Sequence, residues 1–71
     1  MNINIRQHII NNFKDDSTEV LRNSIEESIK EKDELTLPGM GVLLEIIWQG
    51  ADMNLKNQML EIIEKQIKKI G

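Results

Sequence analysis

The segment Leu37–Gly50 constrains the fold of this chain more than any other stretch. It holds the only proline, the only tryptophan and three of the four glycines, and from Val42 to Trp48 every residue is apolar except Glu45. Pro38 suits the first turn of a helix, and Gly50 suits the end of one. A helix that is apolar on nearly all sides is normally buried on nearly all sides. The segment therefore predicts a central helix at about residues 42–49.

Apolar residues recur at helical spacing in three further segments of the chain. Their stripes are Ile5, Ile9 and Phe13 in the first, Leu21, Ile25 and Ile29 in the second, and Leu55, Met59, Ile62, Ile63, Ile67 and Ile70 in the last. Each segment follows a pair of residues that can cap a helix, namely Asn2 or Asn4, Asp16 or Ser17, and Asp52 or Asn54. The expected fold is all-α: one domain over residues 1–71, a compact bundle of about four short helices packed around the central helix.

Two glycines of the central segment, Gly39 and Gly41, stand two residues apart. A phosphate-binding loop would need a third glycine or a Lys-Ser/Thr pair at a fixed distance, and neither follows here. The structural interpretation is therefore favoured, in which Gly39 serves the turn and Gly41 lets another helix pack closely.

The length and composition restrict the class of protein. A chain of 71 residues buries only about 60% of its unfolded surface, so we expect one modest core. The absence of cysteine excludes disulfides and thiolate metal sites. The longest apolar run is far too short to span a membrane, so we expect no membrane association.

The charge does not favour nucleic acid as a partner. The net charge is −3, with five Lys or Arg against eight Asp or Glu in residues 1–36 and four against four in residues 37–71. Neither half has the basic excess that neutralising many phosphates requires. A minor nucleic-acid-associated protein stays an alternative function. Its phosphate contacts would be Arg6, Lys14, Lys65, Lys68 and Lys69.

Two titratable residues, His8 and Glu45, are candidates for functional groups. His8, the only histidine, lies off the first apolar stripe and has no neighbour at metal-ligand or catalytic spacing, so we expect a solvated side chain. Glu45 is either a buried carboxylate with a raised pKa and a function, or part of an exposed line with Gln49; exposure is favoured because an unpaired buried acid is costly. We predict that the protein is not an enzyme and has no catalytic residue, cofactor or metal site.

Trp48 also has a structural and a functional interpretation. It belongs to the core, which is the favoured interpretation, or it anchors a partner surface, where tryptophan is enriched. A domain of this size has difficulty covering every side of so apolar a helix, so an unknown protein partner or a homodimer is expected. The candidate interaction surface consists of Met40, Leu44, Glu45, Trp48 and Gln49.

The central segment also resembles a known family. Leu37–Gln49 (Leu-Pro-Gly-Met-Gly-Val-Leu-Leu-Glu-Ile-Ile-Trp-Gln), followed by Lys56-Asn57 and Met59-Leu60, looks like the small acid-soluble spore proteins of the I type. Asn4-x-Arg6 near the start of the chain adds to the likeness. The resemblance covers essentially the whole chain in length and layout.

This resemblance implies synthesis in the developing forespore and residence in the spore core, the forespore cytoplasm. It supplies no reaction, ligand or set of functional residues. The motifs of the DNA-coating spore proteins of the α/β type are absent from the sequence, so their DNA-saturating role is not carried over. The resemblance thus implies a minor protein of the spore core, and the apolar central helix predicts that it is non-enzymatic and acts by protein binding or self-association.

Overall fold

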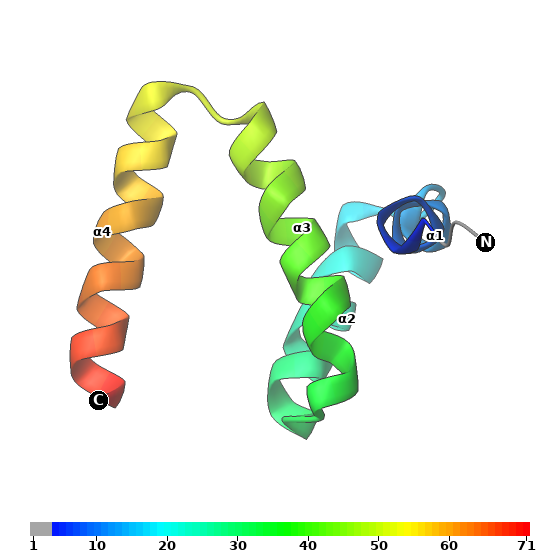
Figure 1. Cartoon of the computed structure of the whole chain (residues 1–71), viewed down its shortest axis with the longest axis horizontal. Coiled ribbons are helices and arrows are strands. Elements are labelled where there is room, and N and C mark those ends of the chain that lie inside the picture. The colour runs from blue at the N-terminus through cyan, green and yellow to red at the C-terminus, as the bar shows by residue number, and fades with distance from the viewer. Residues whose placement is uncertain (1–3) are drawn as a thin grey trace.

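Residues 4–71, which the computed structural model describes, form four α-helices and one short 3₁₀ helix (Figure 1). The helices are α1 (Ile5–Phe13), α2 (Thr18–Glu31), α3 (Leu37–Gly50) and α4 (Met53–Ile70), and the 3₁₀ helix η1 (Glu34–Thr36) leads directly into α3. No strand occurs among these residues. The all-α fold with four helices is confirmed.

Three of the helices begin at a polar side chain that accepts a hydrogen bond from a backbone N–H of the first turn. These caps are Asn4, Ser17 and Asp52, with donor–acceptor distances of 2.9, 3.3 and 2.8 Å. Each is one member of the pair predicted from the sequence; Asn2 lies outside the described residues. Such a cap contributes about 1 kcal/mol to helix stability. The remaining helix, α3, has no side-chain cap and carries Pro38 in its first turn, as predicted.

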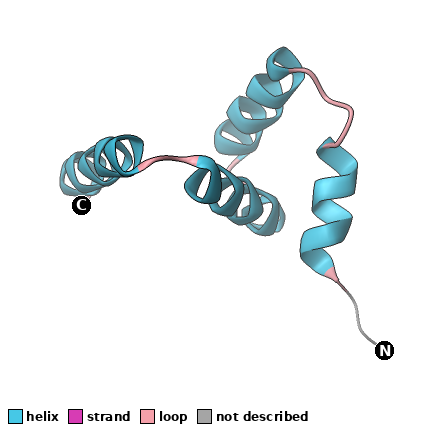
Figure 2. Ribbon diagram, turned by 90° about the horizontal axis from the view of Figure 1, so that it is seen from above, coloured by secondary structure: helices cyan, strands magenta, loops and turns pink. Residues whose placement is uncertain are grey.

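Helices α1 and α4 lie on opposite sides of α3, and α2 lies behind α3 in the view of Figure 1 (Figures 1 and 2). Val42, in the middle of α3, is 6% exposed and is the one buried residue of the described chain. The core therefore sits between α3 and the N-terminal pair of helices, and it is small.

The burial of α3 differs from the prediction. Leu44, Ile46 and Ile47 are about half exposed, so the expectation of a central helix covered on nearly all sides is wrong. The reason is the direction of α4, which diverges from α3 after a two-residue connection (Figure 1). The radius of gyration, 13.7 Å, accordingly exceeds the ~11 Å of a closely packed chain of this length.

The prediction that Gly41 permits close helix packing is also wrong. Gly41 is exposed, and a Cβ atom built on it meets no atom within 4 Å. Its backbone φ is negative, as in any helical residue. Nothing in the described chain therefore requires a glycine here.

Replacing Gly41 with alanine should stabilise the protein. Glycine in a helix interior costs up to about 1 kcal/mol relative to alanine, because its unfolded backbone has more freedom to lose. We expect Gly41→Ala to raise the free energy of unfolding, measured by urea denaturation, by up to about that amount. A decrease would show that another helix approaches α3 closely at this position.

Candidate interaction surface

Four of the five predicted surface residues lie together on α3. Leu44 and Trp48, and likewise Glu45 and Gln49, are four positions apart, which places the four residues on two neighbouring lines of one helix. With Ile63 of α4 they line an open hollow of about 420 Å³. We call this feature the Trp48 hollow. Its walls come from the two helices that diverge after residue 50.

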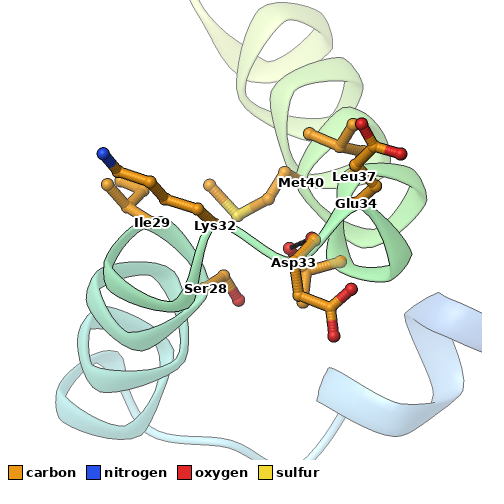
Figure 3. A pocket seen from close by; sticks show the side chains of 8 residues that line it. Ser28, Ile29, Lys32, Asp33, Glu34, Leu37 and Met40 are labelled. Carbon is orange, nitrogen blue, oxygen red and sulfur yellow. Dashed lines mark hydrogen bonds between the residues drawn. The ribbon is translucent and has the colours of Figure 1, made fainter.

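The fifth predicted residue, Met40, lies elsewhere. Its side chain points toward the end of α2 and lines a second open hollow, of about 360 Å³, with Ser28, Ile29 and Lys32 (Figure 3). This hollow occupies the corner between α2 and the start of α3. The structure therefore separates Met40 from the other four residues, although all five share one helix.

Glu45 of α3 forms an ion pair with Arg6 of α1, near the start of the chain. The Nε and Nη2 atoms of Arg6 donate hydrogen bonds of 2.8 and 3.0 Å to the two carboxylate oxygens of Glu45. The fork of the guanidinium matches the carboxylate, so the pair fixes α1 against α3 in one orientation. The Glu45 side chain is 44% exposed, which places the pair at the surface rather than in the core.

The ion pair with Arg6 determines the direction in which the pKa of Glu45 shifts. The hydrogen bonds from Arg6 lower the pKa of Glu45 below its ordinary value of 4.5, partial burial opposes this shift, and the guanidinium charge reinforces it. A functional buried carboxylate would have a raised pKa instead. The alternative in which Glu45 is a buried, high-titrating acid is therefore wrong, and the favoured prediction of an exposed position is nearer to the structure.

Trp48 forms the apolar wall of the hollow and carries a cation above its ring. It is 37% exposed, so the favoured prediction of a core tryptophan is wrong. The Nζ atom of Lys56, on α4, lies 5.2 Å from the ring centroid. This cation–π contact links the start of α4 to the end of α3. An apolar floor with charged groups at its margin is the usual construction of a protein-binding patch.

The residues proposed for phosphate contact do not converge. Arg6 is engaged with Glu45, and Lys14 directly follows α1. Lys65, Lys68 and Lys69 lie in the C-terminal half of α4, on the opposite side of the molecule (Figures 1 and 2). No single face therefore presents all five to one duplex.

His8 is exposed on α1, as predicted. Among residues 4–71 no three His, Asp or Glu side chains are grouped so that they could hold a metal ion. The same part of the chain contains no helix of the length and apolar character that crossing a bilayer requires.

Sequence reasoning missed three partners of the surface, namely Arg6, Lys56 and Ile63. Arg6 and Glu45 are 39 positions apart, so no local spacing connects them. The acid inside an apolar run was nevertheless a signal, because such a group needs a cation or a solvent-facing position. Ile63 and Lys56 belong to the regular pattern of α4, but only the course of the chain after Gly50 brings them near Trp48.

The Arg6–Glu45 pair should make the folded chain more stable at neutral pH than at acidic pH. The pKa of Glu45 is lowered in the folded chain, so the contribution is present above the ordinary value of 4.5 and is lost as the pH falls through the lowered pKa. Glu45→Gln should therefore reduce the thermal midpoint modestly at neutral pH. The difference in thermal midpoint between Glu45→Gln and wild type should become smaller as the pH falls.

Glu61→Gln is the matched control for this experiment. It makes the same chemical change on α4, where no ion pair of Glu61 occurs within residues 4–71. Thermal unfolding followed by circular dichroism across acidic and neutral pH checks both variants. Equal, pH-independent behaviour of the two variants would contradict the assigned role of the pair.

The chain matches a family of known proteins over nearly its whole length. Residues 3–67 match the family model described as small, acid-soluble spore protein I. A small, acid-soluble spore protein I of Bacillus cereus (strain G9842) is 41% identical over 69 residues, which cover 97% of this chain and all of the relative. The protein of the same name from Bacillus anthracis (strain CDC 684 / NRRL 3495) is 39% identical over the same shares of both chains. No solved structure matches significantly.

The match is long enough to assign the family and confirms the resemblance seen in Leu37–Gln49. This part of α3 holds the buried residue of the core and four residues of the Trp48 hollow. The chain belongs to the small, acid-soluble spore protein I family and is therefore a spore protein.

Proposed function

We propose that this chain is a non-enzymatic protein of the spore core that acts by binding protein through the Trp48 hollow. The observation that carries the proposal is the hollow itself, an open apolar surface on two helices that exposes part of a tryptophan. Contiguous apolar patches of this kind mark interaction sites, and tryptophan is enriched among the residues that dominate binding energy.

The charged groups around the hollow support binding rather than chemistry. Arg6 holds Glu45 in its ionised form with a lowered pKa, whereas general acid–base catalysis near neutral pH needs a raised one. Lys56 is placed over the ring of Trp48. Both charges border an apolar surface, which suits a polar rim that orients a partner.

Site-specific photocrosslinking in spores tests this proposal. A photoreactive amino acid at Gln49, which lines the hollow, should form a covalent adduct with protein on irradiation. The same replacement at Gln58 is the matched control, because Gln58 is an exposed glutamine of α4 that does not line the hollow. We expect several-fold more protein adduct from Gln49 than from Gln58. Equal yields, or no protein adduct at Gln49, would refute the proposed function.

A titration with duplex DNA decides the alternative function. Trp48 is the only tryptophan, so its fluorescence reports on the hollow while sedimentation reports on the complex. We expect no binding at moderate salt, since the chain is acidic and its basic residues are dispersed. Binding that weakens steeply as salt increases would instead favour the nucleic-acid-associated role and point to the lysines of α4.

A further inference from the structure

Helix α4 carries an apolar stripe that the rest of the chain covers only at its beginning. We define the α4 stripe as Leu55, Met59, Ile63, Ile67 and Ile70. The exposed fraction is 40% at Leu55 and 41% at Ile63 and then increases to 63% at Ile67 and 84% at Ile70, and α4 contains no buried residue. The cause is the divergence of α4 from α3 (Figure 1). The C-terminal half of the stripe thus faces water.

The accessible surface of the chain is larger than that of a compact monomer of the same mass. The accessible surface is 6565 Å², whereas a compact monomer of 8.2 kDa is expected to expose ~4,500 Å². The excess is about 2,000 Å² per chain. Large apolar residues of α3 and α4 contribute to it, among them Leu44, Ile47, Ile62, Ile67 and Ile70.

The stability of α4 also favours a second surface over the α4 stripe. Most helical stability in proteins comes from packing an amphipathic face rather than from the helix propensity of the residues. In α4 that face is present but largely unpartnered, because only its first half lies near α3. A second surface has to cover the stripe for α4 to be firmly held.

We propose that the partner of the Trp48 hollow is a second copy of this chain, and that the α3–α4 hairpins of two copies pack face to face about a two-fold axis. This inference rests on the proposed function, because it names the occupant of the same surface. In the dimer, the C-terminal half of each α4 stripe packs on the Trp48 hollow of the other copy. The four helices α3 and α4 of both copies then form one bundle with a shared apolar core.

Two observations select a second copy as the occupant. Obligate homodimers bury about 2,000–5,000 Å² in total, or 1,000–2,500 Å² per chain, and the excess surface found here falls in that range. Ile63 belongs to the α4 stripe and also lines the hollow, so the two features adjoin on one chain and a two-fold axis pairs each with its counterpart. Such an interface is self-complementary and closes on itself, which yields a dimer and no filament.

Sedimentation of the full chain over a range of concentrations tests the proposal. We expect a species of twice the 8.2 kDa chain mass, a thermal midpoint that rises with protein concentration, and a blue shift of Trp48 emission on association. Ile67→Lys is the informative variant, because Ile67 is 63% exposed in the monomer and a lysine there disturbs the chain itself little. It should weaken dimerisation about tenfold or more.

Gln58→Lys is the matched control, since it adds the same charge to α4 away from the stripe. It should leave the dimer intact. A wild-type chain that is helical and sediments at the monomer mass at about 100 µM would overturn the proposal, whatever the variants do. Equal weakening by Ile67→Lys and Gln58→Lys would overturn the assigned interface.

The two proposals fail in distinguishable ways. A crosslinked adduct at Gln49 with twice the chain mass supports both. A monomeric chain in solution, with an adduct to a different protein in spores, overturns the second copy as partner and leaves the proposed function standing. No protein adduct at Gln49 refutes the proposed function itself.

Discussion

The apolar circumference of α3 is the constraint on which the rest of the structure depends. One side of the helix packs toward α1 and α2 and buries Val42. The other side meets α4 near the connecting turn and then opens to water, which leaves Leu44 and Ile47 half exposed. A helix that is apolar on all sides needs packing partners on all sides. In a chain of 71 residues, the three other helices do not provide them.

The polar contacts orient the helices and contribute little to holding them together. Arg6 and Glu45 join α1 to α3, and Lys56 above Trp48 joins α4 to α3. Both contacts lie at the surface, where water competes with each charge and salt screens it. They set the register of the elements around α3, whereas apolar burial has to supply the free energy.

Local patterns in the sequence predicted the helices, because caps and stripes are short-range features. Asn4, Ser17 and Asp52 start helices for reasons visible within four residues of each. The grouping of Leu44 with Trp48 followed from helical spacing alone. The turning of Met40 toward α2 and the pairing of Arg6 with Glu45 depend on how helices far apart in sequence meet. The opening of α4 depends on the two-residue connection after Gly50, whose direction no apolar pattern encodes.

The open apolar face has a thermal consequence. Covering apolar surface lowers the heat capacity by about 0.45 cal/mol/K for each Å² removed from water. The driving force for that cover therefore fades as the temperature falls. An assembly that covered the α3–α4 face would therefore weaken on cooling, a response that surface ion pairs alone would not produce.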